Sequence, residues 1–308
     1  MARRISLIGV PTSAGAFAPG QEQAPAALRK AGLVAALETA GLEIEDRGDR
    51  QVWRWRPDRD EPRAQNVGAV VEIVRETAER VALVSHSETN ATQAVALVLG
   101  GDCTVGFGTV AGALAAGGEV GLIYFDAHAD LNVPGSVPEG ALDWMGMAHM
   151  LAEPGTRPEL VEVGPRTPLL RDEQVLLFGW GPEQATEFER AAIERRDLER
   201  IPVAKVAADP AGAAARALAS LETRCEHLLV HFDVDVVDFT DTPLSENLGR
   251  NEGLPFASAL AALGVLLASP KLAALTITEL NPDHREEGSE AIEQLVEALA
   301  AGLAAGPS

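Results

Sequence analysis

The chain has 308 residues, of which 46% are hydrophobic and 23% charged, so it is long enough to bury a large core. A formal net charge of −21 excludes the basic footprint of a protein that binds nucleic acid or an anionic membrane, and no apolar run is long enough to span a bilayer. The two cysteines form no disulfide framework and no signal-peptide segment opens the chain, so we expect a cytoplasmic protein.

Short apolar segments alternate with longer helical segments along the whole chain. Strands are predicted at residues 5–10, 42–46, 94–99, 121–125, 175–178, 228–232 and 274–278. Helices are predicted at residues 25–39, 66–81, 105–116, 144–151, 185–196, 255–267 and 289–303. This alternation predicts an α/β fold with a parallel, doubly wound sheet. Because no linker or repeat interrupts the pattern, we expect residues 1–308 to form a single domain.

One segment outside this pattern interleaves aromatic and arginine side chains. Residues 53–59 read Trp-Arg-Trp-Arg-Pro-Asp-Arg, a combination that stacks on bases or surrounds cations in some proteins. An irregular connection on the surface is the simpler interpretation, and it is the one that we prefer.

The predicted strand at residues 121–125 ends in a cluster of ionisable side chains. Asp126, His128 and Asp130 occupy alternate positions, so an extended backbone directs all three to the same side. Burying two carboxylates and an imidazole is costly unless a cation compensates for their lost hydration. A hydrophilic turn is the alternative, but turns are dominated by Gly, Ser and Pro. The stretch therefore predicts a cation site.

Polar clusters also follow four other predicted strands: Asp102-Cys103, the segment 179–184, Asp233/Asp235/Asp238, and Glu279/Asn281. Ligands of open α/β folds bind at the carboxyl ends of the strands, so these clusters should meet there. Asp233 and Asp235 again alternate, and with the two aspartates of the first cluster they make four carboxylates. Two divalent ions balance that charge, and oxygen ligands with one imidazole favour Mn²⁺. Such a site lowers the pKa of a bridging water, which makes hydroxide available near neutral pH.

The order of these clusters carries a family resemblance that covers nearly the whole chain. The matching motifs are Gly9-Val10-Pro11, the segment 20–29, Gly100-Gly101-Asp102, Asp-Ala-His-x-Asp-x-Asn from residue 126, Asp-x-Asp-x-x-Asp from residue 233, and Glu279-Leu280-Asn281-Pro282. The chain resembles the ureohydrolase superfamily, which includes arginase, agmatinase and formiminoglutamase. The resemblance implies a three-layer αβα fold with a mostly parallel central sheet, and a hydrolase with two Mn²⁺ ions per chain.

The resemblance also implies roles for individual residues. It implies six metal ligands, namely Cys103, Asp126, His128, Asp130, Asp233 and Asp235. Asp126 and Asp233 would bridge the ions, with His128 and Asp235 completing one site, and Asp130 and Cys103 the other. Asp130 and Glu279 would also act in catalysis.

The implied substrate is a small molecule with a guanidine group. Asn132 matches the family's substrate-binding asparagine, and Glu279 matches the carboxylate that holds the guanidinium. The acidic residue for the substrate's amino group aligns with Glu183 or Gln184. The implied reaction cleaves a C–N bond by a bridging metal hydroxide and releases urea or a urea derivative.

Two positions depart from the family pattern. Cys103 stands where most members have His, and a thiolate is a softer donor that favours zinc, cobalt or iron. The alternative is that Cys103 is only a small buried residue and that the ion is lost or weakly held.

Met145 stands where arginases have a proton-shuttling His, and Met transfers no proton. Asp143, His149 or Asp130 would take that role.

The departures favour the branch that hydrolyses N-hydroxy-L-arginine, because an N-hydroxyguanidine is less basic and makes different proton demands. Agmatinase or formiminoglutamase activity is one alternative, and a degenerate fold that binds ligand without turnover is another. We interpret His231 as a partner of the metal ligands or a core residue. Since the chain ends soon after the last predicted helix, we expect a monomer or a homo-oligomer.

Overall fold

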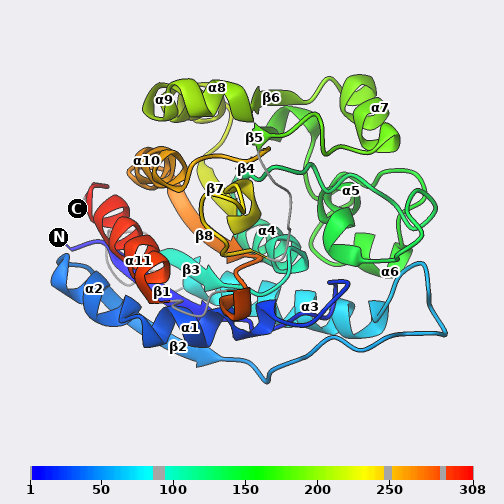
Figure 1. The fold of residues 1–308 in the computed structure, drawn as a ribbon, viewed down its shortest axis with the longest axis horizontal. Helices are drawn as coiled ribbons and strands as arrows, with labels where there is room; N and C mark the ends of the chain where they lie inside the picture. The colour runs from blue at the N-terminus through cyan, green and yellow to red at the C-terminus, as the bar shows by residue number, and fades with distance from the viewer. Residues whose placement is uncertain (1, 86–93, 246–251, 285–288, 308) are drawn as a thin grey trace.

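The structure is a computed structural model that describes the chain except residues 1, 86–93, 246–251, 285–288 and 308 (Figure 1). Within these residues one eight-stranded sheet has the order β2-β1-β3-β8-β7-β4-β5-β6, and every pairing is parallel. The strands are β1 (Arg4–Gly9), β2 (Glu43–Asp49), β3 (Val95–Leu99), β4 (Val120–Phe125), β5 (Val175–Trp180), β6 (Glu199–Pro202), β7 (His227–Asp233) and β8 (Leu272–Thr278). The predicted parallel sheet is confirmed.

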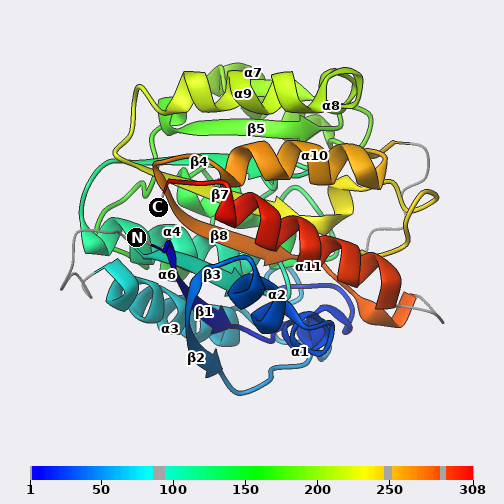
Figure 2. The ribbon, with the colours of Figure 1, turned by 90° about the vertical axis from the view of Figure 1, so that its left-hand side faces the viewer.

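Helices cover both faces of this sheet. One layer contains α1 (Ala24–Lys30), α2 (Leu33–Thr39), α8 (Val203–Ala208), α9 (Pro210–Leu221), α10 (Phe256–Leu267) and α11 (Ser289–Ala304). In this layer α2, α11, α10 and α9 follow one another across the sheet (Figure 2). The other layer contains α3 (Val67–Ser85), α4 (Thr104–Ala116), α5 (Gly146–Met150), α6 (Pro158–Val161) and α7 (Glu187–Arg196). The expected three-layer αβα architecture is therefore confirmed.

Side chains of the inner strands alternate between two hydrophobic cores, one on each face of the sheet. On β4, Ile123 and Phe125 belong to one core, whereas Leu122 and Tyr124 belong to the other. A strand buried on both faces needs apolar residues at successive positions, which explains the continuous apolar runs in the sequence. None of the described helices is long and apolar enough to cross a membrane.

Two segments depart from the prediction, and a third agrees with it. The helix predicted at residues 25–39 is two helices, because Gly32 adopts a φ of 85° between them. The segment 199–221, which forms β6, α8 and α9, was not predicted. β6 is an edge strand with the sequence Glu-Arg-Ile-Pro, so it lacks the apolar run of the inner strands. Residues 53–59 form the irregular connection that we preferred, joined to the loop after β1 by a bridge between Thr12 and Trp53.

The strand order places the polar clusters together. β3, β8, β7, β4 and β5 are consecutive neighbours in the sheet, and because all run parallel, their carboxyl ends lie along one edge. The polar clusters predicted from the sequence follow these five ends. This edge is where the sequence predicts a ligand site, and it opens onto a cavity.

Candidate metal centre

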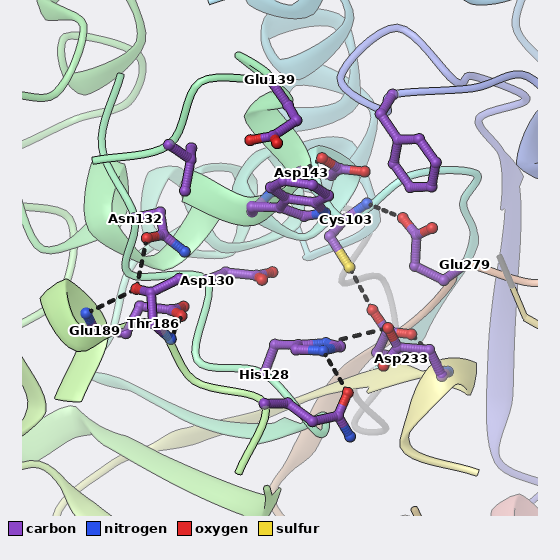
Figure 3. A pocket seen from close by; sticks show the side chains of 15 residues that line it. Cys103, His128, Asp130, Asn132, Glu139, Asp143, Thr186, Glu189, Asp233 and Glu279 are labelled. Atoms are coloured by element: carbon purple, nitrogen blue, oxygen red, sulfur yellow. Dashed lines mark hydrogen bonds and ion pairs between the residues drawn. The ribbon is translucent and has the colours of Figure 1, made fainter. Parts of the chain in front are cut away.

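The cavity at this edge has a volume of about 540 Å³ and is lined by most of the predicted site residues (Figure 3). Of the predicted metal ligands, only Asp126 does not line it, since that side chain is buried beneath the cavity floor. The predicted substrate-binding and catalytic residues that line it are Asn132, Asp143, Gln184 and Glu279. Glu183 is exposed and does not line it, so Gln184 alone is placed to contact a ligand there.

Two groups of potential metal ligands overlap at the cavity floor. Cys103, Asp126, His231 and Asp233 form one group, and Asp126, His128 and Asp235 form the other. Within each group the ligand atoms all lie within 4.8 Å of one another. Asp126 belongs to both groups, which is the arrangement that a bridging ligand requires. Asp130 joins neither of these groups of described residues.

The thiol of Cys103 lies against a carboxylate. Its Sγ donates to Asp233 Oδ2 at 2.7 Å, and it is 3.3 Å from Thr278 Oγ1. Burial and the charges of nearby carboxylates, Asp233 foremost, raise the pKa of Cys103 well above its usual range. The thiol is therefore protonated in this environment, and only a bound cation would favour the thiolate.

The second group contains buried carboxylate oxygens with unmet bonding capacity. His128 Nδ1 lies 3.1 Å from Asp235 Oδ2 and 3.4 Å from Asp126 Oδ1, while its Nε2 lies 3.0 Å from Gln184 Oε1. Asp126 Oδ2 and Asp235 Oδ1 are buried without a hydrogen-bond partner. Burial and the charge of Asp235 raise the pKa of Asp126 to about 7. Orphaned carboxylate oxygens of this kind are costly, and divalent cations would satisfy them. The residues present therefore fit the expected metal ions.

Asp130 has an unusual backbone conformation and a protein partner. Its φ is 49°, in the left-handed region, and its Oδ2 accepts a hydrogen bond from the hydroxyl of Tyr124. Burial, followed by the charge of Asp126, raises the pKa of Asp130 well above its usual range. Its assignment as a metal ligand stays a prediction.

Glu279 occupies the opposite wall, directly after β8. Its Oε1 accepts from the backbone N–H of Cys103 at 2.9 Å, and its Oε2 accepts from Gln21 Nε2 at 3.0 Å. Gln21 belongs to the short helix η1 (Gln21–Gln23) and is fully buried. The φ of Glu279 is 59°, and a left-handed conformation in a residue other than glycine is a strain that proteins concentrate at functional sites.

A hydroxyl network orients Asn132 on another wall. Its Oδ1 accepts from Thr186 Oγ1 at 2.9 Å and from Ser136 Oγ at 3.1 Å. The Oγ1 of Thr186 also accepts from the backbone N–H of Glu189 at 3.1 Å, and Glu189 Oε2 accepts from the backbone N–H of Thr186 at 3.0 Å. Because both hydroxyls hold Oδ1, the Nδ2 of Asn132 is turned toward the cavity as a donor (Figure 3).

The candidates for proton transfer have different surroundings. Asp143 lines the cavity, and burial, followed by the charges of Asp102 and Asp130, raises its pKa well above the usual range. Met145 is buried in a hydrophobic core. His149 is also buried, its Nδ1 is 2.7 Å from Met145 O, and its Nε2 accepts from the backbone N–H of Arg157 at 3.1 Å. His149 does not line the cavity, so the suggestion that it shuttles protons is wrong.

Several residues that line the cavity or contact its lining were not singled out from the sequence. From the sequence we interpreted His231 only as a partner of the metal ligands or a core residue. Its position two residues before Asp233 nevertheless puts it on the same strand face as that aspartate. Thr186 and Glu189 have the Thr-x-x-Glu spacing of a capping box, which marks a helix start but gives no sign of a ligand site. Gln21 and Phe17 carry no local signal, because only the packing of the chain places them here.

Comparisons with known proteins agree with this geometry. A sequence model described as the arginase family matches residues 3–302. An arginase from Brevibacillus brevis is 29% identical over 292 residues, covering 92% of each chain. The native structure of arginase from Bacillus caldovelox superimposes with a TM-score of 0.84 at 26% identity and covers 99% of each chain. Formimidoylglutamase from Bacillus subtilis has the same fold, with a TM-score of 0.76 at 19% identity, covering 99% of this chain and 88% of that one.

Proposed function

Because this chain belongs to the arginase family, we propose that it is a metal-dependent hydrolase that cleaves a C–N bond of a guanidine substrate and releases urea or a urea derivative. The observation that carries the proposal is the pair of ligand groups that share Asp126 on the cavity floor. A shared carboxylate is what two neighbouring divalent ions require. The oxygen-rich donors favour Mn²⁺, with zinc, cobalt or iron as alternatives because of Cys103.

The residues proposed to hold the ions are the six predicted ligands, with Asp126 and Asp233 as bridges. When bound, the ions would neutralise the converging carboxylates and lower the pKa of a water that attacks the guanidine carbon. Asp126 Oδ2 and Asp235 Oδ1, which are buried without a partner, support this assignment.

Glu279 is proposed to bind the guanidinium group of the substrate. Its two oxygens are fixed by Gln21 and by the backbone N–H of Cys103, so the carboxylate is held in one orientation on the cavity wall. A fixed carboxylate and a planar cation make a strong charge-assisted pair. The Nδ2 of Asn132 donates to the far end of the substrate, where Gln184 is the second polar contact.

We further propose that the substrate is an N-hydroxyguanidine of the N-hydroxy-L-arginine type. Because Met145 is in the core and both nitrogens of His149 are engaged, we propose that Asp143 or Asp130, which both line the cavity, protonates the leaving group. The leaving alkylamine is the same as in arginine, but the N-hydroxyguanidine group is less basic than a guanidine, so it makes different proton demands on this carboxyl-lined site. Agmatine and N-formimino-L-glutamate are the alternatives within the same reaction class.

The test compares four substrates on one preparation that has been stripped of metal and reloaded with Mn²⁺. L-Arginine, N-hydroxy-L-arginine, agmatine and N-formimino-L-glutamate are each assayed for the released amine or amino acid and for the urea-like product. We expect N-hydroxy-L-arginine to have the highest kcat/KM, with hydroxyurea as its product. Faster turnover of another substrate would reassign the specificity. A protein that holds two ions per chain and turns over none of the four would be a degenerate, ligand-binding member of the family.

A further inference from the structure

The imidazole of His231 is fixed beside the first ligand group. His231 and Asp233 lie two residues apart on β7, so both side chains leave the same face of the sheet. The His231 side chain is 2% exposed, and its ring stacks on Tyr124 with the centroids 4.3 Å apart and the planes 7° from parallel. This packing holds the ring in a single orientation.

One of the two ring nitrogens of His231 lacks the partner expected in a core histidine. Nε2 lies 3.1 Å from Thr278 Oγ1 and 3.4 Å from Cys103 Sγ, whereas Nδ1 is buried with no hydrogen-bond partner. His149 provides the contrast within the same chain, since both of its nitrogens have backbone partners. Buried polar groups that serve only packing are normally satisfied as in His149. In His231 the unpartnered Nδ1 faces Gly106, whereas Nε2 faces Cys103 of the first ligand group.

The neighbouring helix leaves room for this ring at one position. Gly106 lies in α4, and a Cβ at residue 106 would be 2.4 Å from His231 Nδ1 and 2.8 Å from its Cε1. Such distances are far shorter than any stable contact between these atoms. A histidine ring in this position at residue 231 therefore requires glycine at residue 106.

The strand order explains how His231 reaches the position near Cys103. Cys103 follows β3, His231 lies on β7, and Thr278 of the intervening strand β8 contacts both side chains. We propose that His231 is a metal ligand and supplies the imidazole that a cysteine at position 103 cannot. Each group then offers one imidazole and two carboxylates, with Asp126 shared. The proposal rests on the metal-dependent function proposed above.

The test measures metal binding without substrate, so it is independent of turnover. Protein stripped of metal is reloaded with Mn²⁺, the ions per chain are counted, and imidazole nitrogen couplings to Mn²⁺ are recorded by electron spin-echo spectroscopy. His231→Phe keeps a ring against Tyr124 but removes both nitrogens. We expect the count to fall from about two ions per chain to about one, because a ligand of one site is gone.

Two further variants keep the proposal testable if His231→Phe fails to fold. His128→Phe removes the other imidazole of the two ligand groups. We expect an imidazole coupling to Mn²⁺ to persist in this variant, because it comes from His231. Loss of all imidazole coupling would overturn the proposal. Gly106→Ala displaces the ring without changing a ligand, so we expect one ion to bind about tenfold more weakly or worse. Gly264→Ala is the matched control, because a Cβ there meets nothing within 4 Å; it should bind both ions like the wild type.

The outcomes separate this proposal from the function on which it rests. If wild-type protein binds two ions and hydrolyses a guanidine, but folded His231→Phe and Gly106→Ala bind both ions with unchanged affinity, then His231 is a core residue and only this inference fails. If wild-type protein binds no divalent ion, the proposed metal-dependent function fails, and the inference fails with it.

Discussion

At the scale of single residues, Glu279 depends on a side chain that lies outside the cavity. Gln21 does not line the cavity, yet its amide donates to Glu279 Oε2, and the other oxygen is held by a backbone N–H. The backbone of Glu279 is itself strained, with a φ of 59°, so the surrounding structure must hold this residue in place. The position of the proposed guanidinium-binding carboxylate is therefore set by a residue 258 positions away in the sequence.

Replacing Gln21 by Leu should weaken substrate binding. The change removes a buried hydrogen bond to a carboxylate, which is worth about 2 kcal/mol, so we expect KM to rise about tenfold or more with a smaller change in kcat. Steady-state kinetics measure both constants. Gln23→Leu is the matched control, because Gln23 lies in the same short helix and its amide contacts the exposed Asp283. Equal KM values for the two variants would contradict the positioning role of Gln21.

Asp143 is the cavity residue that we expect to donate a proton to the leaving nitrogen. Asp143→Asn should lower kcat by about 100-fold, the usual contribution of a general acid, with a smaller effect on KM. The pH–rate profile should also lose the limb that reports this group. Asp60→Asn, at an exposed position, should leave both constants unchanged. Wild-type kcat in Asp143→Asn would assign the proton transfer to Asp130.

His149 should make the fold sensitive to mild acid. Burial lowers its pKa from the ordinary value of 6.5 to about 4, so between these pH values the unfolded chain takes up a proton that the folded chain does not. The free energy of unfolding therefore falls as the pH drops from 6.5 to 4, by about 3 kcal/mol in all from this residue. Urea denaturation at several pH values measures this change in the free energy of unfolding. His149→Gln should lose this part of the pH dependence, and parallel curves for the two proteins would refute the assignment.

At the scale of elements, the start of α7 serves both the helix and the cavity. Thr186 and Glu189 form a reciprocal capping box, in which each side chain accepts from the other's backbone N–H. The same Thr186 hydroxyl donates to Asn132. A helix cap is thus coupled to the orientation of a proposed substrate-binding amide.

Thr186→Ala should reveal both roles of this cap. Loss of the cap should lower the free energy of unfolding by about 1 kcal/mol, and loss of the hydroxyl donor to Asn132 should raise KM. Thr186→Ser retains both hydrogen bonds and should resemble the wild type. Denaturation and kinetics are measured on the same preparations. A KM that stays unchanged in Thr186→Ala would separate the cap from the cavity.

At the scale of the whole molecule, the buried carboxylates of the two ligand groups are where the proposed cations would stabilise the fold. Asp126, Asp233 and Asp235 come from the ends of two adjacent central strands and meet at the cavity floor. Their mutual repulsion in a buried site opposes folding unless positive charge joins them. The proposed ions would in this way stabilise the sheet that brings these carboxylates together.

Removal of metal should therefore lower the melting temperature. When free Mn²⁺ is at about 100 times Kd, each bound ion raises the free energy of unfolding by about 2.7 kcal/mol. For a domain of this size, that corresponds to a fall in Tm of about 5–10 °C on chelation. Thermal unfolding with EDTA and with Mn²⁺ measures the difference. The change in Tm on chelation should be smaller in Asp235→Asn and as large as in the wild type in the exposed Asp60→Asn. A wild-type Tm that is the same with EDTA and with Mn²⁺ would argue against bound ions.

The sequence by itself determined the architecture and most of the proposed metal ligands. Buried parallel strands need continuous apolar runs, and side chains alternate along a strand, so the positions of Asp126, His128, Asp233 and Asp235 at one edge followed from local pattern. β6 and the helices after it escaped prediction, because an edge strand half exposed to solvent needs no apolar run.

Only the tertiary structure decided which distant side chains complete the site. The order β3-β8-β7-β4 brings His231 to within 3.4 Å of Cys103, and packing of the loop after β1 brings Gln21 to Glu279. No periodicity encodes these contacts, because they depend on which strands become neighbours and on a glycine in α4 that admits a ring. The imidazole that the motif lacks at position 103 is present, and it comes from another strand.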